Sequence, residues 1–323
     1  MKPRLLVLDD WEGRVAASGC WSKLSNSVDI KYMREPISSA KETEIAGVEF
    51  LMAIRERTAL TEEVFAKMPN LKLILQTGGH AYHIDAHAAQ KRKITIALGR
   101  KIKAPLASIP ELTFAMILGL QHKVPLALKA MRSAEWPLIT GRNLSGRRLG
   151  ILGNGRHGSN VARIAKTAFN MEVVAWDRPG SKNNNSDGIP RVHLDELLQT
   201  SDVVSIHLRL SPESTGLINA GTLLKMKKDA ILINTSRGAI IDEPALIDAL
   251  TKGTIAAAGL DVFAHEPLAK DSPLRSLLNI IITPHIGWTV EEVFEEFAQI
   301  ASTQLFEFMN GTLAPSELLE AHF

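Results

Sequence analysis

The chain has 323 residues, 45% of them hydrophobic, and a formal net charge of +2 at pH 7. A single hydrophobic core stops growing at roughly 250–300 residues, so this length predicts two domains. The composition is that of a globular protein, and the small net charge without a basic block argues against a nucleic-acid-binding protein.

Cysteine use and apolar runs limit where the protein works. Cys20 is the single cysteine, which excludes an intrachain disulfide and suits a reducing compartment. The apolar run at 5–8 is too short for a signal peptide and is followed by two acids. The run at 112–120 is too short to span a bilayer. We therefore expect a cytoplasmic protein without a membrane segment.

The first 103 residues alternate between strand and helix patterns. Short runs rich in Val, Ile and Leu predict strands at 4–9, 28–33, 50–54, 71–76 and 94–97. Helical or turn-like segments separate them, a pattern typical of a parallel sheet with crossover helices. This part contains no G-x-G-x-x-G motif, so we expect it to bind something other than a dinucleotide.

Two groups of polar residues follow strand ends in this first part. Arg55 and Arg57 follow one strand, and the run Thr77-Gly78-Gly79-His80 follows another. Ligands of α/β sheets bind at such ends, and the glycine N–H groups there could hold a carboxylate. A tight turn beside solvated arginines would explain the same residues. The histidines here have no carboxylate or cysteine at ligand spacing, so no metal site is predicted.

Residues 104–136 form the crossing between the two predicted domains. Their pattern is helical, and Pro125 is expected to kink or end a helix. The segment is strongly apolar, unlike a solvent-exposed linker, which makes it a candidate subunit interface.

The stretch 149–158, LGILGNGRHG, predicts a strand, a glycine turn and a helix start. Gly153 permits the tight turn, Gly155 lets a pyrophosphate approach the backbone, and Gly158 lets helix pack on strand. A glycine turn in an ordinary βαβ unit would match the bare motif. The preceding strand, the apolar stripe of the next helix and an acid at Asp177, roughly 20 residues on, favour dinucleotide binding.

Asp177 also bears on which dinucleotide is bound. Its carboxylate can accept hydrogen bonds from the ribose hydroxyls and would repel a 2′-phosphate, which favours NAD. Arg178 is adjacent and could accommodate that phosphate, so NADP remains an alternative. A polar loop then covers 178–190. Further strands are predicted at 203–208, 230–236, 256–262 and 280–283, followed by a last helix at about 290–310.

Three of these late strands each deliver one ionisable group near their carboxyl ends: Arg237, Glu266 and His285. Because parallel strands end at one edge of a sheet, the three side chains could meet beside a nicotinamide ring. Taken singly, each has an ordinary explanation: a surface arginine, a solvated glutamate and a histidine in a turn.

Five blocks together resemble the D-isomer-specific 2-hydroxyacid dehydrogenases. In chain order they are LSGRRLGILGNGRHG, SIHLRLSPESTGLI, MKKDAILINTSRGAIIDEPAL, AAAGLDVFAHEPL and NIIITPHIGWT. The resemblance implies an α/β fold of two Rossmann-like or flavodoxin-like parallel-sheet domains. It places a discontinuous substrate-binding domain at 1–103 and 289–323, and a dinucleotide-binding Rossmann domain at 104–288. It also implies a homodimer.

The resemblance assigns roles to individual positions. The family's catalytic residues fall on Arg237, Glu266 and His285. Substrate-binding positions are Arg55, Gly78, Gly79, Arg237 and His285. Cofactor-binding positions are Gly153, Gly155, Arg156, His157, Gly158, Asp177, Leu208, Arg209, Thr235, Asp261 and Gly287.

The chemistry suits these assignments. Arg237 offers planar bidentate donors to a keto acid, and His285 can donate a proton to the forming hydroxyl. A carboxylate at Glu266 favours the protonated histidine. The sequence thus predicts an NAD-dependent enzyme that transfers a hydride to or from a small D-2-hydroxy or 2-keto acid, like glyoxylate/hydroxypyruvate reductases or phosphoglycerate dehydrogenases.

Three positions depart from the family pattern, and one alternative stays open. His157 stands where the family commonly has a small apolar residue, and His80 where it commonly has a glycine. Arg209 stands where a proline is common, and it could contact a more acidic substrate or a cofactor phosphate. An NAD(H)-sensing, corepressor-like regulator would keep all three catalytic residues. A formate dehydrogenase is disfavoured because that branch lacks the glutamate found at Glu266.

Overall fold

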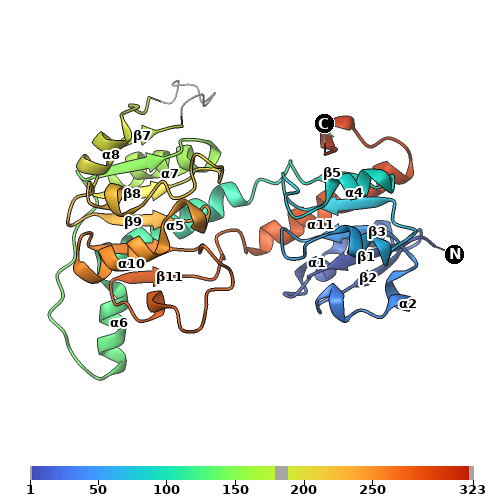
Figure 1. The fold of residues 1–323 in the computed structure, drawn as a ribbon, viewed down its shortest axis with the longest axis horizontal. Helices are drawn as coiled ribbons and strands as arrows, with labels where there is room; N and C mark the ends of the chain where they lie inside the picture. Colours follow the sequence, from blue (N-terminus) through green and yellow to red (C-terminus); the bar gives the residue numbers. More distant parts are fainter. Residues whose placement is uncertain (1, 179–187, 320–323) are drawn as a thin grey trace. The chain divides into compact units, whose positions relative to one another are not determined.

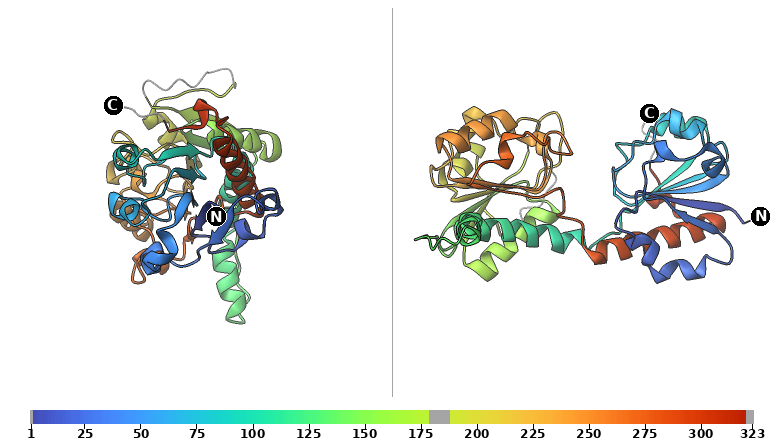
Figure 2. Two further views of the ribbon diagram at one scale, coloured as in Figure 1. Left: turned by 90° about the vertical axis from the view of Figure 1, so that its right-hand side faces the viewer. Right: turned by 90° about the horizontal axis from the view of Figure 1, so that it is seen from below.

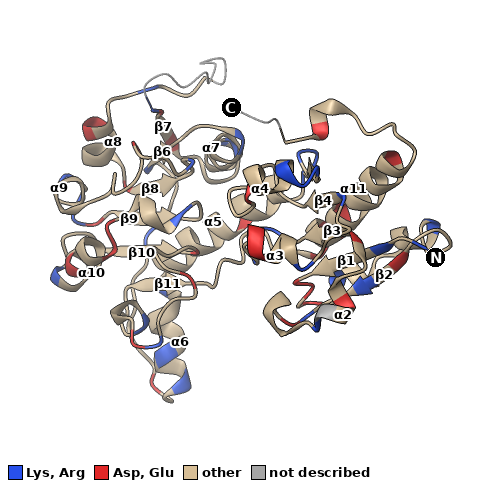
Figure 3. Ribbon diagram, turned by 45° about the vertical axis from the view of Figure 1, so that its right-hand side comes forward, with Lys and Arg blue, Asp and Glu red and all other residues tan. Residues whose placement is uncertain are grey.

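The computed structural model describes residues 2–178 and 188–319, and the chain divides into two units. The first unit runs to Ala104 and resumes at Thr289, and the second covers Pro105–Trp288. The predicted polar loop at 178–190 lies mostly outside the described residues. Acidic and basic residues are interspersed along both units (Figure 3).

The first unit is built on a parallel sheet in the order β2-β1-β3-β4-β5 (Figure 1). Its strands are β1 (Arg4–Leu8), β2 (Asp29–Tyr32), β3 (Val48–Ala53), β4 (Leu73–Gln76) and β5 (Thr95–Leu98). Its helices are α1 (Arg14–Ala17), α2 (Glu42–Ile45), α3 (Glu62–Ala66), α4 (Ala86–Lys91) and α11 (Glu291–Met309). The chain returns as α11, which packs on β4 and α1, so this unit is discontinuous in sequence (Figure 2).

The second unit is a six-stranded parallel sheet in the order β11-β10-β9-β8-β6-β7. Its strands are β6 (Arg148–Leu152), β7 (Glu172–Trp176), β8 (Val203–Ile206), β9 (Ile231–Asn234), β10 (Ala257–Leu260) and β11 (Ile280–Ile282). Its helices are α5 (Pro105–Gln121), α6 (Val124–Arg132), α7 (Arg156–Phe169), α8 (Leu194–Thr200), α9 (Ala220–Leu223) and α10 (Glu243–Lys252).

Helices cover both faces of the second sheet. Helices α5 and α7 pack on one face (Figure 2). There, Phe114, Ile117 and Val161 join a core with Leu149 and Ile233. Helices α8, α9 and α10 cover the other face and contribute to a second core. Because both faces are buried, its strands are continuous apolar runs instead of alternating ones.

The strand order reverses between β6 and β8 in the second unit and between β1 and β3 in the first. Doubly wound sheets bind ligands outside the carboxyl ends of the strands at such a switch point. The order in the first unit is that of flavodoxin-like folds. The α/β class of two parallel-sheet units predicted from the sequence is therefore confirmed. The predicted strands are present, with ends that shift by one or two residues.

The crossing segment differs from the expectation that Pro125 kinks or ends a helix. Helix α5 ends at Gln121, Lys123 takes a left-handed conformation with φ 54°, and Pro125 lies in the first turn of a separate helix, α6. Proline is tolerated there because the first-turn N–H groups of a helix have no intrahelical partner. Pro125 therefore helps to begin a helix. None of the described helices is both long and apolar enough to cross a membrane.

Candidate active site

The glycine turn joins β6 to α7 at the switch point of the second sheet. Gly153 has φ +93°, and a Cβ there would lie 2.9 Å from the carbonyl carbon and oxygen of His207. A Cβ on Gly158 would lie 2.2 Å from the Gly153 oxygen, so only glycine lets the helix pack this closely on the turn. A Cβ on Gly155 would meet only open space. The turn is thus closed on its protein side and open where a pyrophosphate would approach.

The start of α7 also suits an anion. Its N-cap residue is Gly155, which has no side chain to cap the helix, and the first turn holds no acidic residue. The backbone N–H groups of a helix start can bind an anion, and the helix dipole favours a negative charge there. Arg156 is exposed and His157 half-buried in the same turn. These residues fit the pyrophosphate of a dinucleotide.

Asp177 directly follows β7. One carboxylate oxygen accepts a hydrogen bond from the Asn154 backbone N–H at 2.8 Å, and the other accepts from Arg191 Nε at 2.9 Å. The sequence pointed to Arg178 as the neighbouring cation. In the structure, Arg178 instead bonds Ser211 Oγ and lies 3.7 Å from Glu213. Arg191 lies 14 residues after Asp177 and belongs to no motif, so nothing in the sequence marked it.

The three predicted ionisable residues come together at the carboxyl ends of β9, β10 and β11. Glu266 Oε2 lies 2.7 Å from Nδ1 of His285, and Glu266 Oε1 accepts a hydrogen bond from the Phe263 N–H at 3.0 Å. Burial alone would raise the pKa of Glu266. The bonds from His285 and Phe263 and the charge of Arg237 outweigh burial and hold that pKa below its ordinary value.

The backbone loop that carries His285 is held by Asp261. This carboxylate is buried and accepts from Thr283 Oγ1 and from the N–H groups of Ile286 and Gly287, the last two at 2.8 Å each. His285 has φ 57°, a left-handed conformation that costs free energy for a residue with a side chain. The sequence assigned Asp261 to the cofactor, which stays a prediction; the structure shows that it also anchors the histidine loop.

Arg237 is placed by a close approach of two loops. A Cβ on Gly238 would lie 1.9 Å from the carbonyl carbon of Phe263, so only glycine lets the loop after β9 reach the loop after β10. The Arg237 carbonyl accepts from Asn234 Nδ2 at 2.9 Å, and its guanidinium donates to the Ser236 carbonyl at 2.7 Å. The arginine thus lies where its charge acts on Glu266.

The remaining predicted cofactor residues of this unit lie along the same sheet edge. Thr235 is buried, with its hydroxyl 3.1 Å from that of Thr113 in α5. The Leu208 carbonyl accepts from the Ser236 hydroxyl, which links the ends of β8 and β9. Arg209 is exposed, and its carbonyl accepts from Ser214 Oγ at 2.9 Å.

The predicted substrate residues of the first unit form their own cluster after β3 and β4. Arg55 has φ 57°, and its N–H donates to Thr77 Oγ1 at 2.8 Å. A Cβ on Gly78 would lie 3.0 Å from Arg55 Nη1, so the glycine admits the guanidinium. Gly79 is exposed, and His80 Nε2 lies 3.2 Å from Glu56 Oε1. The cluster offers backbone N–H groups and a guanidinium, which suit a carboxylate.

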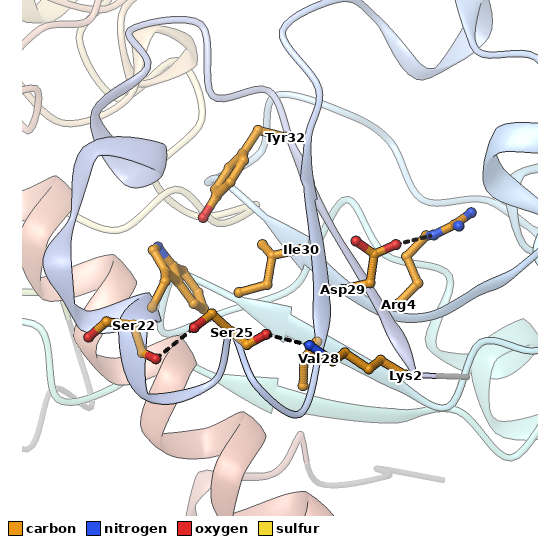
Figure 4. A pocket seen from close by; sticks show the side chains of 9 residues that line it. Lys2, Arg4, Ser22, Ser25, Val28, Asp29, Ile30 and Tyr32 are labelled. Carbon is orange, nitrogen blue, oxygen red and sulfur yellow. Dashed lines mark hydrogen bonds and ion pairs between the residues drawn. The ribbon is translucent and has the colours of Figure 1, made fainter.

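A hollow of about 590 Å³ lies elsewhere, beside the edge strand β2 (Figure 4). Lys2 donates to the Ser25 carbonyl at 3.0 Å, and Arg4 donates to Asp29 at 3.2 Å. The charged groups that line it are therefore engaged, Lys2 by a backbone carbonyl and Arg4 and Asp29 by each other, and none belongs to the sites described above.

Comparison with known proteins bears on the whole chain. Residues 114–287 match the family model for the NAD binding domain of D-isomer specific 2-hydroxyacid dehydrogenases. A hydroxypyruvate reductase of Blautia hydrogenotrophica is 34% identical over 94% of this chain and 93% of its own length. A glyoxylate reductase of Korarchaeum cryptofilum is 31% identical over 98% of this chain and 96% of its own.

A solved structure adds similarity in three dimensions. The D-lactate dehydrogenase of Aquifex aeolicus, complexed with NAD and lactic acid, superposes with a TM-score of 0.81 at 28% identity. The match covers 99% of this chain and 100% of that one. Sequence and fold therefore agree over both units.

Proposed function

This chain belongs to the D-isomer specific 2-hydroxyacid dehydrogenases and is an NAD-linked oxidoreductase of hydroxy and keto acids, and we propose that it reduces glyoxylate or hydroxypyruvate. Two relatives that match over nearly their full length carry those names. The observation that carries the proposal is the Glu266–His285 pair at 2.7 Å, within the influence of the Arg237 charge.

Arg237 binds the keto acid. Its planar guanidinium makes two parallel hydrogen bonds, which match the carboxylate and the adjacent carbonyl oxygen of the substrate. As the carbonyl oxygen gains negative charge, these bonds strengthen, so the same arginine also stabilises the transition state. Arg55, Gly78 and Gly79 remain proposed substrate contacts of the first unit.

His285 supplies the proton. Nδ1 faces Glu266, so Nε2 is the ring nitrogen that donates to the forming hydroxyl. The ionised Glu266 orients the ring and stabilises the imidazolium. In the oxidative direction, the neutral ring takes the hydroxyl proton. The bound nicotinamide supplies or accepts the hydride.

The dinucleotide is assigned to the crevice of the second sheet. Gly153, Gly155, Gly158, Arg156 and His157 would hold the pyrophosphate, and Asp177 would hold the ribose. Leu208, Arg209, Thr235, Asp261 and Gly287 would line the nicotinamide side. The open space at Gly155, which is the N-cap residue of α7, and the absence of acidic residues from the described first turn of that helix support this arrangement.

The protein is further proposed to work in the cytoplasm as a homodimer. The single cysteine supports the compartment. Exposed apolar side chains on α6 and just beyond it support the dimer, because large apolar residues grouped at a surface mark an interface. They are Val124, Leu128, Met131, Trp136 and Leu138. Light scattering after size exclusion would give a dimer mass, and a monomer mass would contradict the proposal.

The function is tested by oxidation of NADH in the presence of glyoxylate, hydroxypyruvate, pyruvate or phenylpyruvate. Turnover with the first two that disappears in His285→Gln is the expected result. Tight NADH binding without turnover on any of the acids would contradict the proposal and favour a dinucleotide-sensing regulator. Turnover that survives in His285→Gln would support the proposed reaction but contradict the role of His285 as its proton donor.

A further inference from the structure

The ribose end of the second unit holds an ion pair. Asp177 and Arg191 meet at 2.9 Å, and their side chains are only 14% and 19% exposed. Surface ion pairs between mobile side chains contribute little to stability. This pair is largely shielded from water, and charges shielded from water interact more strongly than exposed ones.

The backbone fixes the position of Arg191. Residue 191 forms a parallel bridge with Ala175 of β7, through Ala175 N–H to the Pro190 carbonyl at 2.9 Å and Val192 N–H to the Ala175 carbonyl at 3.0 Å. The Arg191 guanidinium also donates to the Ile189 carbonyl at 2.7 Å. The segment thus extends the sheet beside β7 and delivers the guanidinium to the carboxylate at the strand end.

This arrangement changes the electrostatics of the ribose site. An isolated carboxylate after this strand accepts from ribose hydroxyls and repels a 2′-phosphate. Here a guanidinium within hydrogen-bonding distance offsets that charge. A guanidinium is also the side chain best suited to a phosphate, because it presents paired donors.

We propose that Arg191 determines cofactor choice: by neutralising Asp177, it lets this dehydrogenase bind NADP(H) as well as NAD(H). The inference rests on dinucleotide binding by the second unit. Wild-type protein then binds NADPH within about tenfold of NADH. Arg191 is a specificity-determining residue at the ribose, remote from the hydride transfer.

The test measures binding in the absence of substrate, by the fluorescence of the nicotinamide, for NADH and NADPH separately. Arg191→Gln should weaken NADPH binding at least tenfold and change NADH binding by less than threefold. Arg191→Lys keeps the positive charge and should retain most of the NADPH affinity. The control is Arg148→Gln. It breaks an ion pair with Glu172 at the first residues of β6 and β7, away from the carboxyl ends where the ribose would bind, and should change neither affinity.

Other outcomes contradict the proposal. Equal weakening of NADH and NADPH in both Arg191 variants would make Arg191 a purely structural residue. Selective loss of NADH binding would make it a support for the ribose hydroxyl contacts of Asp177. NADPH binding more than a hundredfold weaker than NADH binding in the wild type would also overturn it. Wild-type protein that binds neither dinucleotide would contradict the proposed cofactor site itself, which separates the two failures.

Discussion

Each unit holds a glutamate–histidine pair at the carboxyl ends of its parallel strands. In the second unit, Glu266 meets Nδ1 of His285 at 2.7 Å, and in the first unit, Glu56 meets Nε2 of His80 at 3.2 Å. The residue types and the place in the fold are the same. The ring nitrogen that faces the carboxylate differs, and so does the structure behind each pair.

The support behind the two pairs is unequal. The loop of His285 is held by three hydrogen bonds to the buried Asp261, and Glu266 is fixed by a backbone N–H. His80 stacks on Tyr82, which is 75% exposed, and Arg55 Nε lies 3.5 Å from Glu56. Both histidines keep one ring nitrogen directed away from the carboxylate, so the difference lies in the anchored loop behind His285, which the residue pair alone does not provide.

The largest expected effect is the loss of the proposed proton donor. His285→Gln should lower kcat by about 10²–10⁴-fold, the range for removal of a general acid, without changing NADH binding. His80→Gln should change kcat by less than about tenfold, because no proton transfer depends on it in our proposal. Steady-state kinetics with glyoxylate and a fluorescence titration of NADH measure both. Equal losses in the two variants would remove the distinction between the pairs.

The arginines beside the two pairs should follow the same order. Arg237→Lys keeps the charge but loses the planar fork, and kcat/KM for the keto acid should fall by roughly 100-fold. Arg55→Lys should reduce it by about tenfold, mainly through KM, because it is proposed to hold the substrate without contacting the reacting carbonyl. A larger loss of kcat/KM in Arg55→Lys than in Arg237→Lys would contradict this order and would place the main contact to the substrate carboxylate in the first unit.

The pH dependence separates the two glutamates. Because the pKa of Glu266 lies below its ordinary value, its carboxylate is charged at neutral pH, and the contribution of that charge is lost only as pH falls through the lowered pKa. Glu266→Gln removes the titrating group, so this loss of kcat/KM on the acid side should disappear, and Glu56→Gln should leave it in place. A profile of kcat/KM from about pH 3 to 9 measures this, and an unchanged acid side in Glu266→Gln would remove the proposed role of Glu266.

The elements of the fold were predictable because buried parallel strands are short apolar runs bounded by turns. The same rule located Arg237, Glu266 and His285, since strand ends share one edge of a sheet. The meeting of Arg191 with Asp177 was not predictable. It depends on a bridge between Ala175 and Arg191, which are far apart in the sequence, and no local pattern encodes such a pairing.

Side-chain partners were the other gap. Asp261 was marked by its motif, but its bonds to the histidine loop depend on how β10 and β11 pair. The two glutamate–histidine pairs show the same limit. Residue types at strand ends indicate which groups gather, and packing decides which nitrogen of a ring is engaged.

A third histidine, His207, extends the comparison to a ring without a carboxylate. Its Nε2 lies 2.8 Å from Ser205 Oγ. Burial, and to a lesser extent the charge of His157, lowers the pKa of His207 from 6.5 to about 3. The folded protein therefore keeps this ring neutral at a pH where the unfolded chain binds a proton.

The consequence is a stability term that is fully present above the unfolded pKa and is lost as pH falls toward the folded one. Between pH 7 and pH 5 the term should shrink by about 2 kcal/mol, because the unfolded chain takes up a proton over most of this range while the folded ring stays neutral, and each pH unit then contributes up to about 1.36 kcal/mol. His207→Asn cannot take up a proton. The variant should therefore have a lower free energy of unfolding than the wild type at pH 7, and this difference should become smaller by that amount at pH 5, as measured by urea unfolding at each pH. A constant deficit would mean that His207 is protonated in the folded protein as readily as in the unfolded chain, so that a histidine does not need a carboxylate to hold a proton at this sheet edge.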